Sequence, residues 1–222
     1  MVIRDRRLPG SSLRGLLVGF LLVATTSTAL PARAQVFTAF TQTQSTNNIG
    51  WGVNTTRGWT FTVSTPLVVE ELAFWDSDLN GLAQPHPVGV WTNAGLLLTS
   101  ATVPAGTTAP LDGTFRWVAT PAVTLQPGTT YVIGAYWEAA SPDTRLGGGT
   151  SVAFDPRVTL LGGRGINTVG LAFPSLDVAL ELNANFKARP APTIPALPRA
   201  ALFTLAALLL GACLLALRRA RQ

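Results

Sequence analysis

Apolar and polar positions alternate over short runs through the middle of the chain. Trp59, Phe61 and Val63 are separated by two threonines, which is the period-two pattern of a strand with one buried and one solvated face. The run from Tyr131 to Trp137 repeats this pattern, and turn residues separate such runs about every 8–12 residues. No helical periodicity of useful length occurs between residues 35 and 187. The pattern predicts an all-β fold: a single antiparallel, jelly-roll-like β-sandwich over residues 35–187.

The later part of this region predicts shorter strands. Two are expected at Val158–Leu161 and Leu171–Phe173, and a final one over Val178–Phe186. The stretch from Ser141 to Ser151, which contains three glycines at residues 147–149, predicts a surface loop.

The segment from Leu72 to Trp91 predicts a strand, a polar loop and a second strand. In the loop, Asp76, Asp78 and Asn80 have the alternate spacing of oxygen ligands in a calcium loop, and a glycine follows them. The twelfth position of an EF-hand would be Glu but is Pro87, so an EF-hand is excluded. Two interpretations stay open: a Ca²⁺ site on a β-loop, or a turn whose side chains hydrogen-bond their own backbone. The acids that could complete a calcium site are Asp112, Asp155 and Asp177.

Catalytic chemistry has few candidates in residues 35–189. This region contains one histidine, His86, and no cysteine, so a zinc site of conventional composition is excluded. A Ser-His-Asp triad would need His86, and no G-x-S-x-G motif is present. Glu70 and Glu71 are adjacent, so on a strand they point to opposite faces. We predict a non-enzymatic domain without catalytic residues and without a cofactor other than calcium. His86 is expected to hydrogen-bond a neighbouring carboxylate or solvent.

The aromatic residues lie mostly on alternating strands and are predicted to form the core. Trp51, Trp75 and Tyr136 are the candidates for an exposed platform that stacks on sugar rings. Such a platform would indicate a carbohydrate-binding surface module with a polysaccharide partner.

The net positive charge lies at the two ends of the chain. Residues 35–189 contain seven Lys or Arg and ten Asp or Glu, although the whole chain carries +5. This acidic region does not indicate a nucleic-acid partner. The sole cysteine, Cys213, lies outside it, so the domain is expected to fold without a disulfide.

Residues 1–34 have the organisation of a secretory signal peptide. A basic start precedes an apolar run from Leu16 to Ala24, and the segment ends in the small-x-small pattern Ala32-Arg33-Ala34. Signal peptidase is expected to cut after Ala34. The apolar run is shorter than the roughly 20 residues that span a bilayer, so a retained N-terminal anchor is disfavoured.

The other end of the chain predicts three consecutive segments. Residues 188–199 are a proline-rich linker, which favours an extended spacer. Residues 200–217 are apolar except for Thr204 and predict a transmembrane helix. Residues 218–222 predict a basic cytoplasmic tail by the positive-inside rule, through Arg218, Arg219 and Arg221.

This C-terminal arrangement resembles the tripartite sorting signals of the PEP-CTERM and IPTL-CTERM kind. The short motif is Ile194, Pro195, Ala196 and Leu197, with Ala196 where the IPTL form has Thr. The resemblance implies a membrane-anchored precursor that an exosortase-type enzyme processes, and a final place in the cell envelope, at the surface or in the extracellular matrix. The alternative is a single-pass membrane anchor without processing.

A second resemblance covers roughly Gly58 to Phe186. It rests on Gly58-Trp-Thr-Phe61, Val88-Gly-Val-Trp91, Thr124-Leu-Gln-Pro-Gly128 and Asn185-Phe186. These motifs look like a β-sandwich domain of unknown function that recurs in bacterial surface proteins with such sorting tails. The resemblance implies a fold and a setting but no catalysis. We therefore predict an exported, non-enzymatic β-sandwich protein, with the carbohydrate-binding module as the alternative function.

Overall fold

The computed structural model describes residues 35–42, 47–48, 52–147 and 151–192, together with residues 207, 210, 216, 217 and 220. In this described part of the chain, no helix is long and apolar enough to cross a membrane. Several predicted features lie wholly or mostly outside the described residues: the signal peptide (1–34), the transmembrane helix (200–217), Trp51, Ile194, Pro195, Ala196, Leu197, Arg218, Arg219 and Arg221.

Strands form the regular structure of the described residues between 35 and 192, and all their pairings are antiparallel. The predicted all-β, antiparallel fold is confirmed. The strands are β1 (Phe37–Thr38), β2 (Phe40–Gln42), β3 (Asn47–Asn48), β4 (Thr55–Val63), β5 (Leu67–Trp75), β6 (His86–Thr92), β7 (Leu97–Val103), β8 (Leu111–Asp112), β9 (Phe115–Leu125), β10 (Tyr131–Trp137), β11 (Arg145–Leu146), β12 (Val152–Phe154), β13 (Val158–Ile166), β14 (Leu176–Val178) and β15 (Ala184–Pro190).

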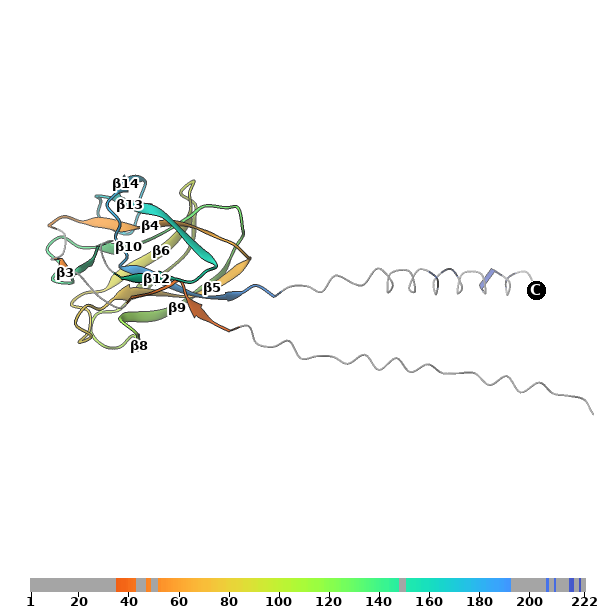
Figure 1. Ribbon diagram of the computed structural model, residues 1–222, viewed down its shortest axis with the longest axis horizontal. Helices are drawn as coiled ribbons and strands as arrows, with labels where there is room; N and C mark the ends of the chain where they lie inside the picture. Colours follow the sequence, from red (N-terminus) through yellow and green to blue (C-terminus); the bar gives the residue numbers. More distant parts are fainter. Residues whose placement is uncertain are drawn as a thin grey trace, which may run out of the picture. The chain divides into compact units, whose positions relative to one another are not determined.

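Two sheets form the layers of the domain (Figure 1). The first sheet has the order β1-β15-β5-β9-β8, and the second has the order β14-β13-β4-β10-β6-β7. The chain crosses repeatedly from one sheet to the other. The resulting orders β1-β15-β5-β9 and β4-β10-β6-β7 are those of the two sheets of a jelly roll. β13 and β14 extend the second sheet beside β4.

The core between the two sheets is aromatic. Trp59 and Phe61 of β4 pack on Phe186 of β15, with ring centroids 6.1 and 5.2 Å apart. The indole N–H of Trp59 donates to the carbonyl of Ala184 at 2.9 Å, so a hydrogen bond also joins the sheets. These are the inward positions that the alternation predicted, and burying each large apolar side chain contributes about 1.5–3 kcal/mol.

The first and last strands of the domain are neighbours. β1 pairs with β15, and Phe37 lies opposite Ala188. β15 continues pairing with β5 as far as Pro190, beyond the predicted domain end at residue 187. Ala188 is a fully buried core position, which explains why the strand does not stop earlier.

The glycines of β13 allow it to run further than predicted. A side chain at Gly163 would meet the backbone oxygen of Val178 at 2.5 Å, and one at Gly165 would meet the side chain of Arg57 at 2.6 Å. The strand therefore extends from Val158 to Ile166 instead of ending at residue 161.

Residues 171–173 do not form the predicted strand but cover the outer face of the second sheet. The amide of Ala172 donates to Thr56 Oγ1 of β4 at 3.2 Å. Pro174 lies over Gly134 of β10, where an added Cβ would be 3.3 Å from its ring. The single strand predicted over residues 178–186 is likewise replaced, by β14 and β15.

Candidate functional site

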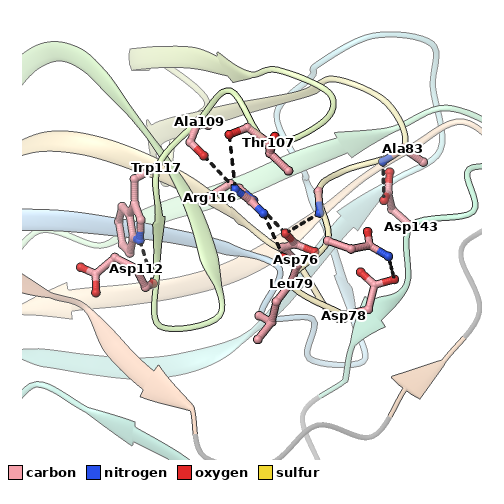
Figure 2. Close-up of polar contacts among 12 residues, drawn as sticks. Asp76, Asp78, Leu79, Ala83, Thr107, Ala109, Asp112, Arg116, Trp117 and Asp143 are labelled. Carbon is pink, nitrogen blue, oxygen red and sulfur yellow. Dashed lines mark hydrogen bonds and ion pairs between the residues drawn. The ribbon is translucent and has the colours of Figure 1, made fainter.

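The Asp-rich loop (residues 76–85) closes around an arginine from another strand (Figure 2). Asp76 follows β5, and its side chain is only 1% exposed. Its Oδ2 accepts hydrogen bonds from Arg116 Nε at 2.8 Å and from the amide of Gly81 at 3.0 Å. Arg116 lies opposite Phe74, so the register of β5 and β9 brings the two charges together. The carboxylate that the sequence offers to a cation is thus paired with a guanidinium.

Arg116 also holds two loops by their backbone carbonyls. Its Nη2 donates to Leu79 O at 3.2 Å, and its Nη1 donates to Ala109 O at 3.1 Å. Leu82 and Gly106 exchange two backbone hydrogen bonds between the same loops. The planar fork of an arginine suits such a multiple contact, because its N–H groups point in fixed directions. This end of the sandwich is therefore organised by one buried ion pair.

The three predicted calcium ligands do not converge, because Asp76 bonds to other groups than Asp78 and Asn80, which bond to each other. Asp76 faces Arg116, whereas Asp78 accepts from Asn80 Nδ2 at 2.7 Å at the exposed tip of the loop. Gly81 has a φ of 113°, which favours glycine and makes the sharp turn. Among the described residues, no three His, Cys, Asp or Glu side chains are grouped to hold a metal. These contacts fit the turn interpretation, and the calcium site stays a prediction. Each acid that could complete it has a basic partner: Asp112 with Lys187, Asp155 with Arg157, and Asp177 with Arg164.

His86 is fully buried at the start of β6. Its Nδ1 lies 2.9 Å from the carbonyl oxygen of Tyr136, and its Nε2 lies 2.9 Å from Asp143 Oδ2. The imidazole stacks on the ring of Phe74, with centroids 3.6 Å apart and 2° between the planes. The expected hydrogen bond between this histidine and a carboxylate is confirmed.

Asp143 joins this histidine to the Asp-rich loop, and Figure 2 shows its contact with Ala83 of that loop. It accepts hydrogen bonds from the amides of Ala83 at 2.9 Å and Gln84 at 3.3 Å. Burial alone would raise the pKa of Asp143, but the hydrogen bond from His86 and those from the two amides hold this pKa below its ordinary value. The carboxylate therefore stays ionised in its partly buried position.

Ser141, His86 and Asp143 lie together without the geometry of a catalytic triad. The hydroxyl of Ser141 is 3.4 Å from Asp143 Oδ2, and both nitrogens of His86 are engaged by Asp143 and Tyr136. Nucleophilic catalysis requires a histidine nitrogen that accepts the proton of the serine hydroxyl. No nitrogen of this ring faces the serine, so the cluster joins loops instead.

A second buried charge group surrounds Glu181, which is 4% exposed. Its Oε1 accepts from Arg145 Nη1 at 3.4 Å. Burial raises the pKa of Glu181 to about 7, against the opposing effect of Arg145 and Arg57. Burial also lowers the pKa of Arg57. Part of the stability of the fold must therefore depend on pH near neutrality.

The predicted aromatic platform is wrong for both of its described residues. Trp75 is 2% exposed and belongs to the hydrophobic core. Tyr136 is 7% exposed, and its hydroxyl donates to Asn54 Oδ1 at 3.1 Å. Alternation places Tyr136 on the outer face of the second sheet, but residues 172–174 cover that face. Neither side chain can stack on a ligand without moving its cover.

A hollow of about 820 Å³ lies where β1, β2 and β12 meet strands of the first sheet. Lys187 reaches into it, with Nζ 4.4 Å from the centre of the Trp117 ring. The same ammonium lies 2.8 Å from Asp112 Oδ2 and 3.5 Å from Glu71 Oε2. These four residues, the Lys187 group, also line a second hollow of about 520 Å³. The group therefore stands between two concave surfaces.

The remaining lining of the larger hollow combines hydrogen-bonding groups with aromatic edges. Asp155 of the lining pairs at 2.7 Å with Arg157, which lies outside the lining and has its guanidinium 3.5 Å from the centre of the Phe37 ring. The charged residues of the lining are Glu71, Asp112, Asp155 and Lys187, so acids outnumber bases at this polar surface. The further polar side chains are Gln35, Thr38, Thr41, Gln42, Thr114 and Asn185.

The sequence interpretation missed Arg116, Asp143 and Lys187. Arg116 did carry a signal, because it stands between Phe115 and Trp117 in an apolar strand, and a charge in such a run needs a buried partner. Asp143 lies in a loop and Lys187 at a half-buried strand position, where charged residues are ordinary.

Residues 38–177 match the model of a family described as Domain of unknown function (DUF4082). This match covers most of the sandwich and agrees with the resemblance noted in the sequence. A comparison with curated proteins finds no match.

Proposed function

The chain belongs to the DUF4082 family of domains of unknown function, and we propose that it is an exported, non-enzymatic protein of the cell envelope or extracellular matrix. The observation that carries the proposal is how the fold uses its acid–base side chains. Asp76 and His86 are buried, and with Asp143 they are hydrogen-bonded to groups of the domain itself. A general acid or base needs a free position within hydrogen-bond reach of the reacting group.

The order of segments in the sequence supports export. A basic and apolar start, a folded domain, a proline-rich stretch, an apolar segment and terminal arginines follow one another. In this proposal signal peptidase releases residues 1–34, and residues 200–217 hold the precursor in the membrane. An exosortase-type enzyme then processes the chain near Ile194–Leu197 and releases the domain to the envelope.

Mass spectrometry of the surface form tests this course of events. The mature chain is expected to begin at Gln35 and to end between Pro192 and Arg199. A surface form that retains Gln222 would contradict processing and leave a single-pass anchor with an external domain. A chain that still begins at Met1 and stays inside the cell would contradict export altogether.

The hollows beside the Lys187 group favour a second candidate, a carbohydrate-binding surface module. A volume of about 820 Å³ lies within the range of small-ligand sites, roughly 300–1,000 Å³. Its lining offers hydroxyl, amide and paired charged groups, which match the many donors and acceptors of a polysaccharide. Asp112, with 64% of its side chain exposed, can accept from sugar hydroxyls while Lys187 donates to them.

A glycan array on the purified domain tests this candidate. Lys187→Met removes the ammonium between the hollows and is expected to abolish binding. Arg189→Met is the matched control, because Arg189 lies on the same strand and pairs with Glu70 but does not line either hollow. Equal binding by both variants would remove the hollows from consideration, and no binding by the unmodified domain would reject the module.

A further inference from the structure

His86 faces a hydrogen-bond acceptor at each ring nitrogen. Nδ1 points to the carbonyl oxygen of Tyr136, which cannot donate, and Nε2 points to Asp143 Oδ2, both at 2.9 Å. A neutral imidazole donates from one nitrogen only. Either His86 carries a hydrogen on both nitrogens, or Asp143 is protonated.

The other contacts of Asp143 decide between these two states. The amide of Ala83 donates to Oδ1 and the amide of Gln84 donates to Oδ2. The hydroxyl of Ser141 donates to Oδ2 as well. A carboxylate that accepts from donors at both oxygens is stabilised as the anion, and its pKa is correspondingly lowered. The hydrogens between the two residues therefore reside on His86.

The surroundings of the ring suit a cation. Phe74 of β5 offers its face at 3.6 Å, and Trp137 of β10 lies edge-on at 5.6 Å. Val103 of β7 is the register partner of His86, and β7 carries no ionisable side chain. The ionisable groups of the elements packed on the ring have other partners or lie exposed: Asp76 with Arg116, Arg145 with Glu181, the Tyr136 hydroxyl with Asn54, and exposed Glu138. In the described part of the chain, Asp143 is thus the counter-charge of this histidine.

We propose that His86 is a buried imidazolium that acts as a latch, fastening the loop of residues 138–144 to the Asp-rich loop through Asp143. One ion pair holds three segments, because Asp143 belongs to the first loop, Ala83 and Gln84 to the second, and His86 to the start of β6. The inference is independent of the proposed function, since it concerns the arrangement of these loops alone.

The latch is closed only while both charges are present. Asp143 has a lowered pKa in the folded protein, so its contribution to stability is complete above the ordinary value of about 3.9 and is lost as the pH falls through the lowered one. We expect the two loops to loosen as the pH falls through the lowered pKa of Asp143, while the core of the sandwich stays folded.

Nitrogen NMR of the imidazole in the folded protein is the first test. The chain has one histidine, so the two ring signals need no further assignment. Both nitrogens are expected to carry a hydrogen at neutral pH. A neutral tautomer in the folded protein would overturn the proposal, and this measurement needs no variant.

Amide hydrogen exchange at Ala83 and Gln84 is the second test. Asp143→Asn keeps the shape of the side chain but removes its charge, and exchange at both amides is expected to rise about tenfold or more, because hydrogen bonds to charged groups are the stronger ones. Asp155→Asn is the matched control, since it removes a carboxylate paired with Arg157 instead. Unchanged exchange in Asp143→Asn, or an equal rise in both variants, would reject the latch.

Discussion

Two basic residues of the first sheet differ in the burial of their ion pairs and therefore in the structural role of their charge. Arg116 on β9 and Lys187 on β15 each contact carboxylates. The Arg116 and Asp76 side chains are 5% and 1% exposed, whereas Asp112, the closest partner of Lys187, is 64% exposed. The first pair fastens loops to the end of the sandwich, and the second lies between two hollows.

The difference lies in what each charge loses if its partner is removed. An unpaired charge in the interior cannot recover its hydration, so breaking a buried pair is strongly destabilising. An exposed charge recovers its hydration from solvent, and surface ion pairs contribute little to stability. Arg116 is therefore committed to the fold, whereas Lys187, with 17% of its side chain exposed, pairs with a partner that solvent can reach.

Arg116→Met is expected to lower the free energy of unfolding more than the other changes. It leaves Asp76 buried without its cation and releases the carbonyls of Leu79 and Ala109, so the free energy of unfolding should fall by about 3–5 kcal/mol. Urea unfolding measures this change. Arg116→Lys keeps the charge but loses the planar fork, so its free energy of unfolding should lie between those of the unmodified protein and Arg116→Met. A loss below about 1 kcal/mol for Arg116→Met would place this pair in the same class as the exposed one.

Glu181→Gln extends the comparison to a buried acid with a weak partner. The pKa of Glu181 rises from 4.5 to about 7 on folding, so the folded protein binds this proton more tightly than the unfolded chain. The free energy of unfolding should therefore fall as the pH rises from 4.5 to 7, by up to about 3 kcal/mol. Glu181→Gln should remove this dependence in urea unfolding at pH 5 and pH 8. The exposed Glu138→Gln serves as control, and a dependence that survives in Glu181→Gln would assign it to another group.

Lys187→Met should change the free energy of unfolding by less than about 1 kcal/mol. The substitution keeps the apolar stem of the side chain and removes the ammonium that lies 4.4 Å from the centre of the Trp117 ring. Arg189→Met is the comparison on the same strand. Destabilisation of Lys187→Met as large as that of Arg116→Met would mean that the Lys187 group serves the fold.

Calcium should have the smallest effect. Because Asp76 is paired with Arg116, we expect millimolar Ca²⁺ to leave the melting temperature unchanged relative to chelator. A rise in the melting temperature that Asp78→Ala removes would instead establish the calcium loop.

The local alternation of apolar and polar residues predicted the strands better than it predicted which strand faces are covered by other segments. Trp59 and Phe61 are core residues, as the alternation with threonines over a few residues predicted, although the opposite face of their strand is also largely buried. Tyr136 follows the same rule on the opposite face but is buried, since a distant segment around Pro174 lies over its sheet. No local pattern announces such a cover.

The candidate site was predicted in part for a similar reason. The spacing of Asp76, Asp78 and Asn80 correctly marked a tight turn, with Gly81 at its bend. The partner of Asp76 is forty residues away in the sequence and is selected by the register of β5 and β9. Spacing along the chain identifies groups with suitable chemistry, but strand register determines which of them meet.

The neighbouring positions of β1 and β15 determine how the domain would carry mechanical load. Phe37 lies opposite Ala188 in an antiparallel pair, so tension between the two ends opens this pair from one side, one rung after another. The pair has only two rungs, whereas β15 is held to β5 by seven. Pulling should therefore peel off β1 at low force and then meet a stronger element. A domain attached through β15 alone has a single point of attachment, so tension would not act across its core and would not stretch the sandwich.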